Sequence, residues 1–297
     1  MSKVHRTPDL RFTAIPDYPF APNFHELRDG LRVHYVDEGP KDAVPVLMMH
    51  GEPSWSFLYR KMIGPVTQAG HRVIAPDLIG FGKSDKPTSK SAFSYAAHVA
   101  WMREWFEALD IRDVILACQD WGSLIGLRLV AAMPDRFAAV VLSNGGLPAG
   151  QEAPPAFAKW RTFAKMSPVF PIGSIIQKAT TTDLSDDIVA AYNAPFDTRG
   201  SKAAARIFPA LVPLGENIAN ADQHAAWKVL ETFDKPFVCC FSDSDPITKG
   251  GAQAFMDRIP GAKNDLHRTL KGGHFIQEDD PEGFAQTILD TVEYARR

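Results

Sequence analysis

The stretch Gln-Asp-Trp-Gly-Ser at 119–123 follows an apolar run at 115–118 and precedes leucine and isoleucine residues at helical spacing. This pattern predicts a strand that passes through a sharp turn into a helix. The helix N-terminus favours negative charge at such a turn, and its N–H groups can stabilise an oxyanion. Asp120 stands at the apex and is a candidate nucleophile. The alternative is that Asp120 only caps the helix, a position that aspartate often takes.

Other segments supply the groups that a nucleophile at such a turn requires. The glycine-rich KGGH segment places His274, a candidate general base, after the last expected strand. Asp243 and Asp245 follow the preceding strand, and either could be the acid that orients this base. The segment MHGEPSWS offers the backbone N–H of Glu52 as a second oxyanion donor. The chain order of nucleophile, acid and histidine is the order that this arrangement needs.

The elements that must position these residues alternate between strands and helices along the chain. Continuous apolar runs predict buried strands, and apolar residues at a spacing of four predict helices. This alternation predicts an α/β fold with a mostly parallel, eight-stranded sheet and helices on both faces. Strand patterns lie in 24–38, 44–51, 71–87, 113–120, 138–146, 235–245 and 264–274, and helix patterns in 94–110, 124–129 and 282–296.

The segment 148–222 differs in character from the rest of the chain. It contains eight prolines, short helical stretches and no convincing strand. We therefore expect a helical cap domain over 148–222, inserted into a core domain formed by 1–147 and 223–297.

The composition is that of an ordinary globular protein. The 297 residues are 45% hydrophobic and carry a net charge of −3, which gives no sign of a nucleic-acid partner. Cys118, Cys239 and Cys240 lie in apolar runs and are expected to be reduced core residues. The N-terminus lacks the apolar region of a signal peptide, and no stretch suits a membrane span. We expect a cytoplasmic protein without membrane association.

Taken together, the motifs resemble those of the haloalkane dehalogenases in the α/β-hydrolase superfamily. The resemblance rests on HGEPSWSFLYRKMI, PDLIGFGKSDKP, QDWGSLIGLRL and GGHFIQEDDP, and continues through the expected cap in AFAKWRTFA and AAYNAPFDT. It covers nearly the whole chain. It implies that Asp120 is the nucleophile and His274 the general base. The pattern is typical of the subfamily whose acid follows the strand after the cap, which corresponds to Asp245.

The resemblance also implies roles for the groups around the nucleophile. The backbone N–H groups of Glu52 and Trp121 would form the oxyanion hole. The indole N–H groups of Trp121 and Trp160 would bind the departing halide, since indole is a donor with an apolar body. Four phenylalanines are candidates for the substrate pocket, with ordinary cap packing as the alternative: Phe157, Phe163, Phe170 and Phe208.

The implied reaction explains an aspartate where related turns carry serine. An ionised carboxylate can displace a halide from a saturated carbon, which forms an alkyl ester of Asp120. Water activated by His274 then attacks the carboxyl carbon of that ester. Because all the reacting groups belong to the protein, we expect no metal or organic cofactor. The expected partners are a small haloalkane and its halide, and the expected state is a monomer.

Three other functions remain open at this point. An epoxide hydrolase would need two cap tyrosines as donors to the epoxide oxygen, whereas 148–222 contains Tyr192 alone. A fluoroacetate dehalogenase would need an arginine pair for the substrate carboxylate, and Trp121 stands where such enzymes carry arginine. A non-catalytic binding protein of the same fold would form no ester at Asp120.

Overall fold

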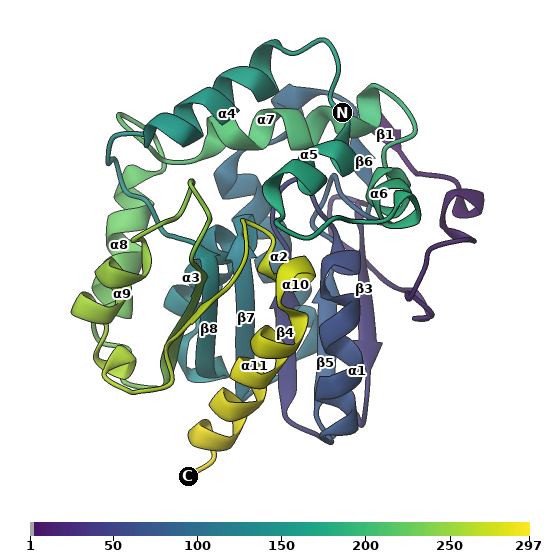
Figure 1. Cartoon of the computed structure of the whole chain (residues 1–297). Coiled ribbons are helices and arrows are strands. Elements are labelled where there is room, and N and C mark those ends of the chain that lie inside the picture. The colour runs from purple at the N-terminus through teal and green to yellow at the C-terminus, as the bar shows by residue number, and fades with distance from the viewer. Residues whose placement is uncertain (1–2) are drawn as a thin grey trace.

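The computed structural model describes residues 3–297 and places an eight-stranded sheet at the centre of the molecule (Figure 1). The strand order is β10-β9-β8-β7-β4-β5-β3-β2, and a separate two-stranded sheet pairs β1 with β6. The inner strands are apolar and buried along their length, as strands covered on both faces must be. Their bounds are β1 (Val4–His5), β2 (Asn23–Glu26), β3 (Arg32–Glu38), β4 (Pro45–Met49), β5 (Arg72–Pro76), β6 (Lys86–Pro87), β7 (Val114–Asp120), β8 (Phe137–Gly145), β9 (Phe237–Ser242) and β10 (Arg268–Leu270).

The strand directions confirm the prediction of a mostly parallel sheet. Parallel pairing runs from β5 through β4, β7, β8 and β9 to β10. At the opposite edge, β3 runs antiparallel to both β2 and β5. The turn between β2 and β3 contains Gly30 at a φ of +82°, a conformation that glycine adopts without strain. The carboxyl ends of the parallel strands therefore meet at one edge of the sheet.

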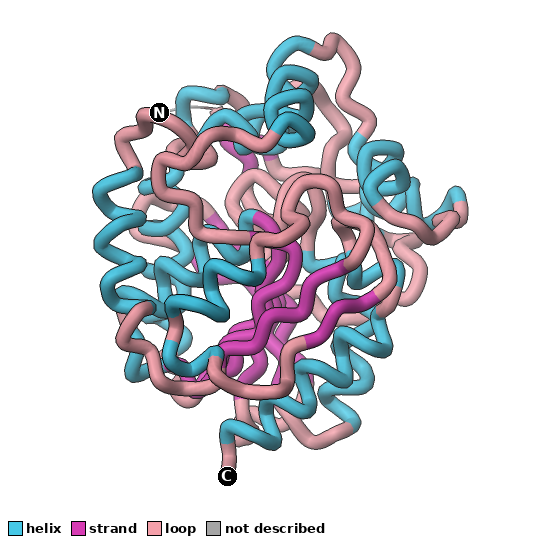
Figure 2. The backbone as a smooth tube through the Cα atoms, turned by 60° about the vertical axis from the view of Figure 1, so that its left-hand side comes forward, coloured by secondary structure: helices cyan, strands magenta, loops and turns pink. Residues whose placement is uncertain are grey.

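Helices cover both faces of this sheet (Figures 1 and 2). On one face α1 packs against α11, and on the other α3 packs against α2 and α8. Both α3 and α11 contact β7 and β8, so the strand that leads to the predicted turn is enclosed on both sides. The bounds of these core helices are α1 (Arg60–Gln68), α2 (Tyr95–Leu109), α3 (Trp121–Ala132), α8 (Asn220–Leu230), α9 (Ala252–Arg258), α10 (Ile276–Asp279) and α11 (Pro281–Ala295).

Four helices lie over the carboxyl edge of the sheet, at the top of Figure 1. Here α4 packs against α7, and α5 against α6. The segment 148–222, all of which the structure describes, contains no strand, and the expected boundary at 222 falls inside α8. The bounds of the four helices are α4 (Pro155–Met166), α5 (Ile172–Ala179), α6 (Asp186–Asn193) and α7 (Ala203–Leu211).

A buried charged cluster fastens α6 to the core. Glu278 on α10 accepts two hydrogen bonds from the Arg60 guanidinium, at 2.5 and 2.9 Å, and one from the Tyr192 hydroxyl on α6. Burial alone would raise the pKa of Glu278, but the bonds and charge of Arg60 hold it below its usual value. Because only Phe275 separates His274 from the start of α10, the cluster also ties the overlying helix α6 to the loop that carries this histidine.

The three cysteines are free and buried in β7 and β9, which confirms the expectation from their apolar surroundings. Among residues 3–297, no helix combines the length and the apolar character that crossing a membrane would require.

Candidate active site

Asp120 ends β7 and immediately precedes α3, at the sharp turn that the sequence predicts. Its backbone has a φ of 50° and a ψ of −124°, a strained conformation for a residue with a side chain. The turn also depends on close backbone packing, because a Cβ at Gly122 would lie 2.0 Å from the Met49 carbonyl oxygen. The tight turn therefore fixes the direction of the Asp120 side chain.

The Asp120 carboxylate does not cap α3, so the capping alternative is wrong. Its Oδ1 instead accepts a hydrogen bond of 2.6 Å from the backbone N–H of Glu52, in the loop after β4. Its Oδ2 lies 3.6 Å from the Nε2 of His274. Trp121 is the first residue of α3, where backbone N–H groups have no partner within the helix. The carboxylate thus lies between an oxyanion-type donor and a base.

His274 lies in the loop between β10 and α10, next to α5. Its backbone N–H donates to the carbonyl of Ala179 at 2.7 Å, and its ring Nδ1 lies 2.9 Å from Oδ2 of Asp245. Burial alone would lower the pKa of His274, but the carboxylates of Asp245 and Asp120 outweigh burial and raise it to about 10. The ring therefore connects the two carboxylates, with one nitrogen toward each.

The structure distinguishes the two candidate acids in the loop after β9. Asp245 is buried and accepts hydrogen bonds from the Ile247 N–H, at 2.9 Å, and from the Thr248 hydroxyl. Burial would raise the pKa of Asp245, but the neighbouring His274 and these bonds hold it below its usual value. Asp243 is exposed and bonded to Ser244 and the Gly272 N–H instead. Asp245 is therefore the carboxylate placed to orient the His274 ring.

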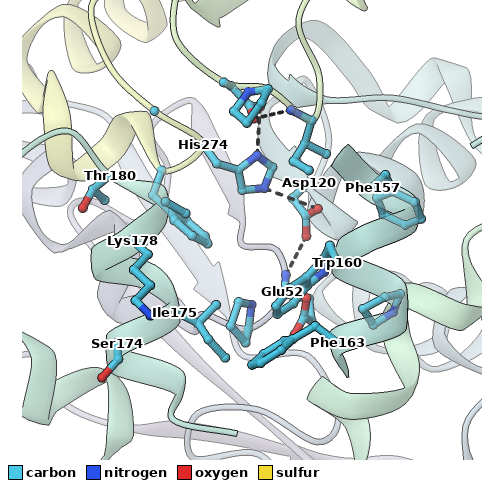
Figure 3. A pocket seen from close by; sticks show the side chains of 18 of the residues that line it. Glu52, Asp120, Phe157, Trp160, Phe163, Ser174, Ile175, Lys178, Thr180 and His274 are labelled. Carbon is cyan, nitrogen blue, oxygen red and sulfur yellow. Dashed lines mark hydrogen bonds and ion pairs between the residues drawn. The ribbon is translucent and has the colours of Figure 1, made fainter. Parts of the chain in front are cut away.

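A cavity of about 660 Å³ opens in front of Asp120, between the sheet edge and helices α4 and α5 (Figure 3). Trp121 lines the core side, while Phe157, Trp160 and Phe163 line it from α4. Three residues at a spacing of three place their rings on one side of α4. The cavity is therefore largely apolar, with the Asp120 and His274 side chains at its base.

Two of the four candidate pocket phenylalanines do not line this cavity, so that prediction is wrong for them. Phe170 lies behind the wall, where its ring packs 5.7 Å from the ring of Trp160. Phe208 is fully buried and packs 4.4 Å from the ring of Trp121. Phe170 and Phe208 therefore pack behind Trp160 and Trp121, respectively, and support these two rings at the cavity.

The side chain of Glu52 is a cavity group that the sequence reasoning did not identify. It is 5% exposed, and its Oε1 has no hydrogen-bond partner among the described residues. Burial and the charge of Asp120 raise the pKa of this carboxyl well above its usual range, partly opposed by the charge of His274. The position of Glu52 in the expected oxyanion loop, beside Asp120, is the sequence signal that could have identified its side chain.

Helix α5 forms a further wall of the cavity, which the sequence reasoning also missed. Ser174, Ile175 and Lys178 line the cavity from this helix, with Thr180 just beyond its end. Their spacing of three to four residues is the helical signal that could have found them. It could not show that this side of the helix faces the cavity.

The fold and the site together define an α/β hydrolase whose sharp turn carries an aspartate. The model of the α/β hydrolase fold family matches residues 44–281. The haloalkane dehalogenase of Psychrobacter cryohalolentis is 50% identical over 98% of each chain. That of Mycolicibacterium paratuberculosis is 47% identical over 96% of this chain and 97% of its own.

Comparison with solved structures also finds haloalkane dehalogenases. The tetrameric haloalkane dehalogenase DpaA from Paraglaciecola agarilytica NO2 superposes with a TM-score of 0.91 and 31% identity, over 97% of this chain and 98% of its own. The chain therefore belongs to the haloalkane dehalogenase family of α/β hydrolases.

Proposed function

We propose that the chain hydrolyses the carbon–halogen bond of small haloalkanes to an alcohol, a halide ion and a proton. The observation that carries the proposal is the Asp120 carboxylate at the base of a cavity walled by Trp121 and Trp160. An apolar cavity of this kind suits a haloalkane, and weak indole donors suit a departing halide.

The first step is an in-line displacement at the halogenated carbon. An Asp120 carboxylate oxygen forms a bond to that carbon while the carbon–halogen bond breaks, and the halide leaves with the bonding electron pair. The indole N–H groups of Trp121 and Trp160 stabilise the charge that develops on the halide. The step leaves an alkyl ester of Asp120 and needs no proton transfer.

The second step hydrolyses this ester. His274 takes a proton from a water molecule, whose oxygen attacks the carboxyl carbon of Asp120. The backbone N–H groups of Glu52 and Trp121 stabilise the oxyanion on the former carboxylate. The bond between the carboxyl carbon and the alkoxy oxygen then breaks, and the imidazolium donates its proton to that oxygen as the alcohol leaves. The proton of the new carboxylic acid is released through His274, which leaves Asp120 ionised. Asp245 stabilises the transient imidazolium.

The charges of the site favour this order of steps. In the resting enzyme, the Asp120 carboxylate is one of the groups that raise the pKa of His274. Ester formation removes the negative charge of Asp120, so the pKa of His274 falls in the intermediate. The histidine therefore becomes a better acceptor for the proton of water at the stage where the reaction requires it.

The other functions fit the site less well. Tyr192 donates its hydroxyl to Glu278 and does not line the cavity, so it is not available to an epoxide oxygen. No arginine within residues 3–297 lines the cavity, which disfavours a fluoroacetate dehalogenase. A non-catalytic binding protein would not need the contact between His274 and Asp245.

We further propose that 148–222 acts as a cap that supplies one wall of the substrate site. Trp160 on α4 is its principal contribution to halide binding. A monomer is the state we propose, since Asp120, His274, Asp245, Trp121 and Trp160 all line the same cavity within a single chain. The free cysteines favour a reducing compartment such as the cytoplasm.

The test is product analysis with purified protein. Bromide release from 1-bromobutane and 1,2-dibromoethane is measured beside diol formation from styrene oxide. Bromide with little diol would support the proposed activity. Diol without bromide would replace it with epoxide hydrolysis, and neither product would replace it with a binding function.

The assignment of the acid gives a paired prediction. We expect Asp245→Asn to lower turnover by about 10²- to 10⁴-fold, since the amide would disfavour the required tautomer and would not stabilise the imidazolium. The matched variant Asp243→Asn changes an exposed carboxylate in the same loop and should keep nearly full turnover. Steady-state halide release measures both. The reverse ranking would assign the role to Asp243.

A further inference from the structure

Gln119 is a buried polar residue that the mechanism above does not use. It precedes Asp120 on β7 and its side chain is fully buried. Its amide nitrogen lies 3.0 Å from the Nε2 of the His274 ring and 3.2 Å from the His274 backbone carbonyl oxygen. It therefore contacts the ring nitrogen that must accept the proton of water.

The backbone carbonyl determines which way the Gln119 amide faces. A carbonyl oxygen only accepts hydrogen bonds, so the amide group 3.2 Å away must be the NH₂ group. The amide oxygen, Oε1, has no hydrogen-bond partner among the described residues. If the amide were turned so that Oε1 faced the His274 carbonyl oxygen, two hydrogen-bond acceptors would face each other. The second N–H of the amide consequently points at the Nε2 of His274, where it requires an acceptor.

We propose that Gln119 is a positioning residue that keeps the Nε2 of His274 free of a proton, so that this nitrogen can accept one from the hydrolytic water. The inference deepens the proposed dehalogenation and rests on it. An N–H donor at Nε2 is compatible with the neutral ring whose proton is on Nδ1, facing Asp245. The same donor disfavours the imidazolium, because the amide N–H of Gln119 and the N–H on Nε2 of His274 would then face each other.

This contact acts against the carboxylates around the ring. Asp245 and Asp120 stabilise the imidazolium, whereas the Gln119 amide stabilises the neutral base. The amide and the water compete for one lone pair, so the contact also costs some intrinsic basicity. Its benefit is greatest near neutral pH, where it increases the fraction of base that is unprotonated. The charged and titratable groups that face this part of the site are Asp120, Asp245, Glu52 and, at the cavity wall formed by α5, Lys178.

The experiment measures the two chemical steps separately as a function of pH. Rapid-quench analysis with 1,2-dibromoethane gives the rate of bromide release and the rate at which the alkyl-enzyme decays. The variants are Gln119→Met, which removes the donor, and Gln119→Glu, which replaces it with an acceptor. The control is Gln277→Met, the same change at a fully buried glutamine on α10 whose side-chain amide makes no hydrogen bond to His274.

The rate of alkyl-enzyme decay should fall at low pH, where His274 is protonated. We expect this acid limb of the pH profile to move to higher pH by about one unit in Gln119→Met and further in Gln119→Glu. Decay at pH 7 should then fall about tenfold in Gln119→Met, while its rate on the alkaline plateau is kept or increased. Alkylation of Asp120 should change little in Gln119→Met. The Gln277→Met variant should follow the wild type throughout.

The proposal would be overturned by a Gln119→Met acid limb that coincides with the wild type, or by equal losses at every pH in both steps. NMR of the His274 ring in the wild type adds a measurement that needs no variant. Above its titration the neutral ring should carry its proton on Nδ1, and an Nε2–H tautomer there would also overturn the proposal. If the wild type itself releases no bromide, the proposed dehalogenation is wrong. This outcome is distinct from a failure of the Gln119 proposal, which is judged on the variants and the ring tautomer.

Discussion

Asp120→Ala is expected to abolish dehalogenation, with a loss in halide release of at least about 10⁴-fold. The variant lacks the atom that forms the bond to carbon, and it loses the carboxylate that the Glu52 N–H and His274 contact in the site. Water in an apolar cavity is a poor nucleophile toward a saturated carbon, so the residual rate should be close to the uncatalysed one. Halide release under saturating 1,2-dibromoethane measures the effect.

The control for this variant is Asp113→Ala. Asp113 precedes β7 and also has a positive φ, of 53°, but it is exposed and far along the strand from the cavity. The two variants therefore share the strain of placing alanine at a positive φ, while only Asp120→Ala removes the proposed nucleophile. Asp113→Ala should keep nearly full turnover. Sustained halide release by folded Asp120→Ala would contradict the assignment of the nucleophile.

His274→Phe is expected to react once and then stop. The first step uses only Asp120 and the indole donors, so one halide per enzyme should be released. The second step needs a base for water, and its loss should slow ester hydrolysis by about 10³-fold or more. The phenyl ring keeps the volume of the imidazole, which limits damage to the buried surroundings of this residue. Intact-mass measurement should show the protein heavier by one bromoethyl group after reaction with 1,2-dibromoethane.

The matched control replaces a histidine away from the cavity. His224 is exposed on α8, and His224→Phe should turn over continuously with no accumulated adduct. Mild alkaline treatment of the His274→Phe adduct should release the alkyl group, as expected for an ester, and peptide mapping should locate it at Asp120. Continuous turnover by His274→Phe, or the absence of any adduct, would rule out the two-step mechanism.

Local patterns in the sequence were sufficient to predict the fold and to select Asp120 and His274 as the principal candidate site residues. The apolar run before Asp120 and the helical spacing after it define a strand–turn–helix without reference to distant residues. The continuous apolar runs could be satisfied only by strands covered on both faces, which favours a parallel sheet. In such a sheet the carboxyl ends of the strands share one edge. The positions of Asp120 and His274 after their strands therefore predicted that they would meet.

Only the tertiary structure decided which of the neighbouring residues lie in contact with His274 and the cavity. Asp243 and Asp245 are two residues apart in one loop, and no local pattern distinguishes them; the 2.9 Å contact of Asp245 with His274 does. The four phenylalanines were equal candidates for the pocket in the sequence, and only the packing of the helices assigns Phe170 to a layer behind the cavity wall.

The sequence by itself thus determined the fold, the family and the order of the candidate site residues along the chain. The contact between Gln119 and His274 joins residues 155 positions apart and depends on how a loop packs against a strand end. The burial of the Glu52 carboxyl beside Asp120 likewise depends on the helices that close the cavity. Periodicity reports which side of an element is apolar, whereas such contacts are set by the packing of whole elements against one another.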